Sequence, residues 1–222
     1  MKIYIKSAIG NPLQDDRDAQ WELAQTSDDT DLLSQLAESY DEQIVYQVLK
    51  NPNTSPELLK KFVDINPRAY NYDRRKAELA MENPNMPIEV LSDLDKYPHL
   101  WESIALNDST PVSVLQKLIS KCLADNYIDL LSIIAINPNA PEDLLDRMFN
   151  SGSIPNLCRL AKNTNLPRYM QESLSEHSTD YIRENLACNP GVDTDILQKL
   201  CNDESNSVSS YAAHTLSERG EI

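Results

Sequence analysis

Histidine and cysteine, the side chains best suited to binding metals or acting as nucleophiles, are few and scattered in this sequence. None of the three histidines belongs to an HExxH motif or has a second histidine or a cysteine one helical turn away, and no two cysteines form a CxxC pair. Cys188 and Cys201 are predicted to be small apolar fillers of a core. The sequence therefore predicts no metal site, no cofactor and no catalytic residue. The residues concerned are His99, His177 and His214, and Cys122, Cys158, Cys188 and Cys201.

Carboxylates are abundant, and pairs such as Asp15-Asp16 and Asp28-Asp29 have the composition of an acid–base site. Neither pair comes with a candidate base or nucleophile that would make it one. Acidic residues of this kind also stabilise the N-terminal ends of helices, where the helix dipole is positive. We interpret them as helix-end and loop charges, and expect the protein not to be an enzyme.

One segment concentrates basic side chains and is the alternative site, a phosphate-binding surface of a nucleic-acid-binding or DNA-repair type of helical-repeat protein. The simpler interpretation, which we favour, is a solvated face around an insertion. The whole chain has 35 acidic and 20 basic residues and a net charge of −15, which repels nucleic-acid phosphates and anionic membranes. The segment consists of Lys60, Lys61, Arg68, Arg74, Arg75 and Lys76.

These side chains must be positioned by a repeat, because one short pattern recurs along almost the entire chain. A small or apolar residue is followed by a variable residue and then by Asn, often Asn-Pro. Successive copies lie about 25 residues apart, with two longer intervals of about 30. Ala24 and Ala213 mark degenerate end copies with Thr in place of Asn. The complete copies centre on Asn51, Asn83, Asn107, Asn137, Asn163 and Asn189.

Each copy predicts two helices. A proline shortly after the Asn, followed by apolar residues at helical spacing, predicts a helix with Pro at its first position and Ser55 or Thr110 as a cap. A shorter helix precedes each Asn, as in Ile182, Leu186 and Ala187, whose spacing places them on one face. Asn before Pro favours an extended backbone that ends this helix, and its amide can bond to unpaired turn backbone.

The pattern as a whole predicts an all-α fold, a right-handed α-solenoid of about seven repeats of about 25 residues, each an α-helix plus a short α or 3₁₀ helix. Four glycines against 13 prolines disfavour a β-rich fold or a Gly-rich phosphate loop. We expect an N-terminal cap segment at residues 1–18, in which residues 2–6 alternate like a strand, and the solenoid at residues 19–222. The longer intervals place insertions near residues 66–75 and 121–129.

The short helices also predict a binding surface. If one side is buried, the positions four and five residues before each Asn lie on the opposite side and form a row that we call the ladder. Solenoids use such rows as extended binding surfaces. The alternative is that Ile133 is buried and the others merely face water. The ladder consists of Tyr46, Gln47, Glu102, Ser103, Ile133, Arg159, Glu184, Asn185 and Tyr211, accompanied by Ser132, Cys158 and Ser210.

The unit that runs from Tyr181 through Asn189-Pro190 to Asp203 resembles the repeat of the leucine-rich repeat variant family, and the resemblance extends over residues 19–216. That family consists of bacterial solenoids in which each unit pairs an α-helix with a short or 3₁₀ helix. It implies an architecture rather than an activity. A member of the family is associated with an iron–sulfur segment, but this chain lacks the closely spaced cysteines that such a cluster needs. The general plan is also similar to that of HEAT arrays.

We therefore expect a non-catalytic protein-binding scaffold, acidic and without a cofactor, whose partner is another protein, most simply a basic one. Neither nucleic acid nor a membrane is the expected partner. The sequence contains neither a signal peptide nor a run of the ~20 apolar residues needed to span a bilayer. With unpaired cysteines, this predicts a protein of the reducing cytoplasm.

Overall fold

Helices make up all the regular secondary structure of the computed structural model, which describes residues 16–69 and 72–221. No strand occurs in these residues, so the all-α prediction is confirmed there. The strand suggested at residues 2–6 lies outside the described residues. The chain divides into two compact units, Met1–Ser109 and Thr110–Ile222.

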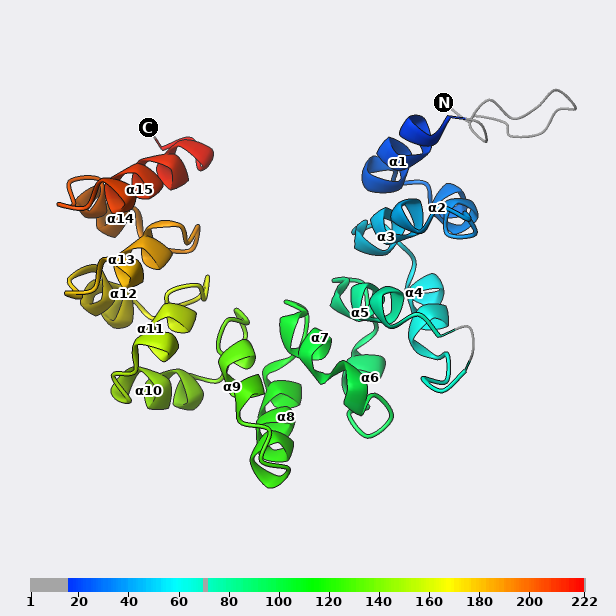
Figure 1. Ribbon diagram of the computed structural model, residues 1–222, viewed down its shortest axis with the longest axis horizontal. Coiled ribbons are helices and arrows are strands. Elements are labelled where there is room, and N and C mark those ends of the chain that lie inside the picture. Colours follow the sequence, from blue (N-terminus) through cyan, green and yellow to red (C-terminus); the bar gives the residue numbers. More distant parts are fainter. Residues whose placement is uncertain (1–15, 70–71, 222) are drawn as a thin grey trace, which may run out of the picture. The chain divides into compact units, whose positions relative to one another are not determined.

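The first unit has one row of helices formed by α1, α3, α5 and α7, each packed against the next, while α2, α4 and α6 lie in a second layer (Figure 1). A short 3₁₀ helix leads into α7. Helix α1 begins close to the predicted boundary at residue 19. The bounds are α1 Arg17–Thr26, α2 Thr30–Leu36, α3 Glu42–Lys50, α4 Pro56–Val63, α5 Arg74–Glu82, α6 Ile88–Leu91, η1 Pro98–Leu100 and α7 Trp101–Leu106.

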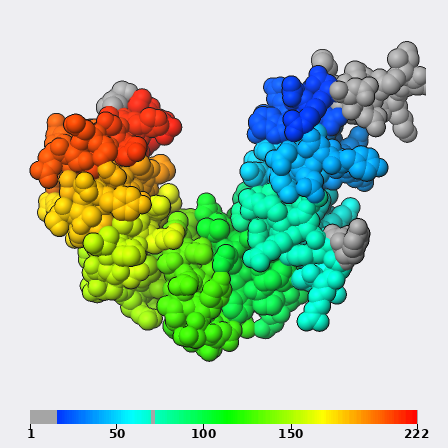
Figure 2. Space-filling view, viewed as in Figure 1, coloured from blue at the N-terminus to red at the C-terminus, as the bar shows by residue number. Residues whose placement is uncertain are grey.

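The second unit repeats this arrangement. Helices α9, α11, α13 and α15 pack in sequence along one row, and α10, α12 and α14 alternate with them in the other layer (Figure 1). Within each unit the sequence colours follow one another in bands, as expected when each repeat packs on its neighbours in the chain (Figure 2). The bounds are α8 Val112–Ala124, α9 Asp129–Ile134, α10 Glu142–Asn150, α11 Ile154–Leu160, α12 Arg168–Ser175, α13 Asp180–Ala187, α14 Thr194–Leu200 and α15 Asn206–Glu218.

The repeated asparagines join neighbouring repeats through buried hydrogen bonds, a feature we call the asparagine lock. Each lock side chain is at most 3% exposed. In four copies the Nδ2 atom donates to two carbonyl oxygens of the preceding repeat. One carbonyl lies at the end of the preceding short helix, where helical carbonyls lack a partner within the helix. The other belongs to the preceding Asn and also accepts a backbone N–H of its own turn, as Asn51 O does from Thr54 at 3.1 Å. The pairs at 2.7 to 2.9 Å are Asn83 with Leu49 and Asn51, Asn107 with Met81 and Asn83, Asn163 with Ala135 and Asn137, and Asn189 with Ala161 and Asn163.

The other half of each lock acts within its own turn. The Oδ1 atom accepts a hydrogen bond from the backbone N–H two residues later, for example Asn163 from Asn165 at 2.8 Å. The predicted role of the Asn amide is therefore confirmed at both ends. In the last copy Thr215 stands for Asn, and its hydroxyl donates only to Ala187 O, at 2.7 Å. The terminal repeat thus keeps a reduced lock.

The small residue that marks each copy is buried where the repeats approach one another. Ala24, Leu49, Ala80, Ala105, Ala135, Ala161 and Ala187 are all 0% exposed, whereas the end copy Ala213 is partly exposed. In the third copy an extra residue separates Ala80 from Asn83, and the carbonyl that meets the next lock is that of Met81. The carbonyl bound by the next lock is therefore set by its distance from the Asn in the turn and not by the position of the alanine.

Prolines mark the start of the second helix in five repeats. In four of them the helix begins one residue after the proline, whereas the sequence predicted the proline at the first helical position. Pro56 is inside α4, behind the cap Ser55, whose hydroxyl accepts from Leu58 N–H at 3.3 Å. In α6, α8, α10 and α12 the proline is itself the N-cap and Thr110 is not. Its extended ψ keeps it outside the helix while its carbonyl accepts the first helical bonds. These four prolines are Pro87, Pro111, Pro141 and Pro167.

The two insertions lie where one helix follows another. The first belongs to the connection between α4 and α5. The second lengthens α8 to 13 residues, against 9 in α10, and continues into a loop where Asn126 has a positive φ of 55°. Asn tolerates this left-handed conformation better than most residues.

Candidate functional site

In the first unit the ladder lies on α3 and α7. Tyr46 and Gln47 are partly exposed, and Gln47 Oε1 accepts from Gln25 Nε2 of α1 at 3.2 Å. Glu102 is exposed, but Ser103 is only 3% exposed and donates to Glu82 Oε1 of α5 at 3.1 Å. Ser103 therefore departs from the prediction of an accessible row, because it is used in the contact between neighbouring repeats.

In the second unit the ladder residues lie on α9, α11, α13 and α15. Arg159 and Tyr211 are exposed, while Ile133, Glu184 and Asn185 are partly exposed. Glu184 accepts a hydrogen bond from the Ser207 hydroxyl of α15. The same helix buries Leu186 completely, as the helical phase predicts. Cys158, the companion of Arg159, is 9% exposed and belongs to the core.

A pocket of about 430 Å³ opens between α9, α10 and α11, within the 300–1,000 Å³ range of small-ligand sites. It includes two ladder positions, Ser132 and Arg159. Leu144 and Met148, 3% and 7% exposed, are its most deeply buried lining residues. Leu131, Pro155 and the half-exposed Ile128 complete its apolar lining. The polar side chains are those of Asp129, Ser132, Arg147, Asn156 and Arg159.

Two of the polar groups belong to Arg147 and Arg159, which form no ion pair with a carboxylate of residues 16–69 or 72–221. The other three arginines of the second unit all form ion pairs: Arg168 with Asp193 and Asp195, Arg183 with Asp203, and Arg219 with Glu221. Within residues 110–221, the two unpaired guanidinium groups thus line the same pocket. Sequence analysis missed Arg147, because its importance depends on α10 lying beside α11.

The basic segment in the first unit does not form a free cationic surface. Arg74 and Arg75 contact Glu78, at 2.8 and 3.4 Å, and Lys76 contacts Glu42 and Asp73, at 3.3 and 3.2 Å. These pairs sit at the start of α5 and neutralise that half of the segment. The structure places Lys60 and Lys61 at the end of α4 and Arg68 in the connection that follows. The arrangement favours the solvated-face interpretation.

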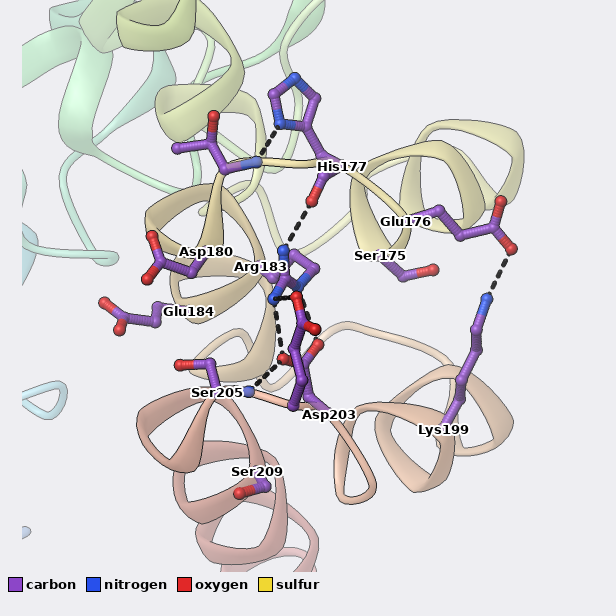
Figure 3. Close-up of polar contacts among 12 residues, drawn as sticks. Ser175, Glu176, His177, Asp180, Arg183, Glu184, Lys199, Asp203, Ser205 and Ser209 are labelled. Carbon is purple, nitrogen blue, oxygen red and sulfur yellow. Dashed lines mark hydrogen bonds and ion pairs between the residues drawn. The ribbon is translucent and has the colours of Figure 1, made fainter.

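The most buried charges of the second unit hold helices together rather than form a reactive site (Figure 3). Arg183 on α13 reaches Asp203 in the connection between α14 and α15 through two bonds of 2.7 and 2.8 Å, and its Nη1 donates to His177 O at 2.7 Å. Asp203 Oδ1 also accepts from Ser205 N–H at 2.9 Å. These contacts lower the pKa of Asp203 and keep it ionised, and Arg183 is their largest cause.

The cysteines lie apart in different helices and turns, and all four are free. Cys188 is exposed, although it directly follows the buried Ala187, so its prediction as a core filler is wrong. Partial desolvation raises the pKa of its thiol, and the charge of Glu184 adds to the rise, which disfavours the nucleophilic thiolate form. Cys122 is fully buried, with its pKa raised to about 11.

Histidine is the residue most able to make stability depend on pH near neutrality. The ring of His99 packs edge-on against Tyr72 with centroids 5.7 Å apart, and burial, helped by the charge of Arg74, lowers the pKa of His99. Among the described residues, no group of three or more His, Cys, Asp or Glu side chains is placed to hold a metal ion.

We expect acidification to destabilise the first unit through His99. The pKa of His99 is lower in the folded protein than the unfolded value of 6.5. The contribution of neutral His99 to the free energy of unfolding is therefore complete above pH 6.5 and is lost as pH falls through the folded-state pKa. Urea unfolding at about pH 7.5 and about pH 5.5 should show a smaller pH effect in His99→Gln than in the wild type. The control is His214→Gln, an exposed histidine of α15. An unchanged pH effect in His99→Gln would contradict this assignment.

No helix in the described part of the chain has the length and apolarity to cross a membrane. Comparisons with known proteins assign nothing to the ladder or the pocket: no protein-family model fits the chain, and no curated protein or solved structure matches it. The resemblance to leucine-rich repeat variant solenoids accordingly stays a prediction drawn from the repeat unit.

Proposed function

We propose that this chain is a right-handed α-solenoid of about seven repeats that serves as a non-catalytic, cytoplasmic scaffold and binds a basic protein through the ladder. The observation that carries the proposal is the lock itself. Within each unit the same buried hydrogen bonds recur from repeat to repeat and hold the short helices in a row, so that side chains at equivalent positions lie at regular intervals.

The chemistry of the ladder suits protein recognition. Tyr46 and Tyr211 offer aromatic surface with a polar tip, the kind of side chain enriched at protein interfaces. Glu102 and Glu184 contribute carboxylates, and the net charge of −15 favours a partner of opposite sign. The nucleic-acid alternative has less support, since half of its basic segment is paired with Glu42, Asp73 and Glu78.

The test uses the wild-type protein and two variants to capture binding partners from a cell lysate. A ladder variant, Tyr46→Ala/Glu102→Lys/Tyr211→Ala, should lose a partner that the wild type retains. The matched control carries Glu57→Lys and Lys117→Ala, exposed residues of α4 and α8, and should retain it. Capture should also weaken as ionic strength rises, because exposed charges are screened.

Circular dichroism melts would show that both variants are folded. Retention of the same partner by the ladder variant would refute the ladder as the binding surface. A specifically bound partner with a strongly acidic net charge would refute the electrostatic half of the proposal, and bound nucleic acid would favour the alternative.

A further inference from the structure

The pocket between α9, α10 and α11 combines the buried side chains of Leu144 and Met148 with two guanidinium groups that form no ion pair with the described residues. In a chain with 35 acidic and 20 basic residues, arginines readily find acidic partners, and Arg168, Arg183 and Arg219 have done so. Arg147 and Arg159 come from consecutive helices and line one opening. Such a pair matches a carboxylate, which a guanidinium can bind through two parallel hydrogen bonds.

The net charge of the pocket further restricts the class of ligand that it can bind. Asp129 also lines the pocket, so two positive groups and one negative group leave a single positive charge. A monoanionic carboxylate matches that balance, whereas a phosphate dianion or a nucleic-acid backbone would bring additional negative charge towards Asp129. The surrounding aliphatic side chains of Ile128, Leu144 and Met148 suit an apolar neighbour of the carboxylate rather than water.

We propose that this pocket binds an acidic side chain of a partner protein, an Asp or Glu that follows or precedes an aliphatic residue. The inference rests on the proposed function and deepens it, because Ser132 and Arg159 belong both to the ladder and to the pocket. In an otherwise basic partner, such an acidic–aliphatic pair would fix the register of the partner along the ladder. The ladder charges would then attract the partner, and the pocket would select the sequence bound.

Both arginines also lie in the last turn of their helices, where a positive charge favours the helix dipole. Stabilising the helix dipole requires a positive charge but no particular arrangement of hydrogen-bond donors. Lysine keeps the charge and lacks the planar fork of donors. Replacement by lysine therefore distinguishes a dipole partner from a carboxylate receptor.

The direct test is a titration of the full chain, labelled at Met and Ile methyl groups, with acetyl-Leu-Glu-amide and with its Gln counterpart. The Glu peptide should shift the Met148 and Ile128 methyl signals and bind at least about 10-fold more tightly than the Gln peptide. Arg147→Gln/Arg159→Gln should abolish this preference, and Arg147→Lys/Arg159→Lys should reduce it. Arg168→Gln, another exposed arginine of the same unit, should leave it unchanged.

Equal binding of the two peptides, absence of methyl shifts, or tighter binding of inorganic phosphate than of the Glu peptide would each overturn the inference. The partner-capture experiment separates this failure from that of the proposed function. If capture depends on Tyr46, Glu102 and Tyr211 and persists unchanged in Arg147→Gln/Arg159→Gln, the scaffold stands and the pocket assignment fails. If the ladder variant also captures the partner as well as the wild type does, the proposed function fails, whatever the result of the peptide titration.

Discussion

Replacing Arg183 by Met should lower the free energy of unfolding by about 3–5 kcal/mol, because it leaves a buried carboxylate without its counter-ion. The side chains of Arg183 and Asp203 are only 7% and 9% exposed. The substitution preserves much of the apolar stem but removes both bonds to Asp203 and the bond to His177 O (Figure 3). Urea unfolding near neutral pH measures the effect.

The control is Arg168→Met, in which an equally elaborate but exposed ion pair is removed. Arg168 is 52% exposed while contacting Asp193 and Asp195, so its loss should cost no more than about 1 kcal/mol. The double variant Arg183→Met/Asp203→Leu should recover part of the stability lost in Arg183→Met, since both charges then disappear. Equal costs for Arg183→Met and Arg168→Met would show that the Arg183 pair is not effectively buried.

The same pair gives a pH dependence of definite sign. The pKa of Asp203 is lower in the folded protein than its ordinary value of 3.8. Its contribution is therefore complete above pH 3.8 and is lost as pH falls through the folded-state pKa. The difference in stability between the wild type and Arg183→Met should shrink over that acidic range.

Asn163→Asp should destabilise the second unit by at least about 3 kcal/mol, through a change of a single atom in the asparagine lock. Asn163 is 1% exposed, and its Nδ2 donates to Ala135 O at 2.9 Å and Asn137 O at 2.8 Å. A carboxylate has no donor for these oxygens and would set a negative charge against them. Lowering the pH should reduce the loss, because a protonated carboxyl group can donate once.

The chain itself supplies two controls for this experiment. Asn165 is exposed and makes one bond to Pro138 O at 3.0 Å, so Asn165→Asp should cost less than about 1 kcal/mol. Asn163→Thr imitates the reduced lock of Thr215 and should fall between the two. The lock would lose its proposed role if urea unfolding gave the same stability for all three variants.

The sequence by itself determined the helical repeat and the way each repeat ends. Asn, Pro and the small residue act within a few residues of one another, and their effects on backbone conformation need no knowledge of distant contacts. The sequence also predicted that the Asn amide bonds to turn backbone, but only the structure shows that the carbonyls it meets belong to the preceding repeat, as for Asn83 and Asn189. The same local pattern identified the end copy in which Thr215 replaces the Asn.

Only the tertiary structure decided which exposed side chains are available and which charges are paired. Ser103 and Arg159 occupy the same ladder position in different repeats, yet one is buried against Glu82 and the other lines a pocket. Asp203 binds Arg183 across 20 residues, whereas Arg147 forms no ion pair with a carboxylate in the part of the chain that the structure describes. Burial and ion pairing depend on distances between helices that are remote in sequence, and a local pattern leaves those distances open.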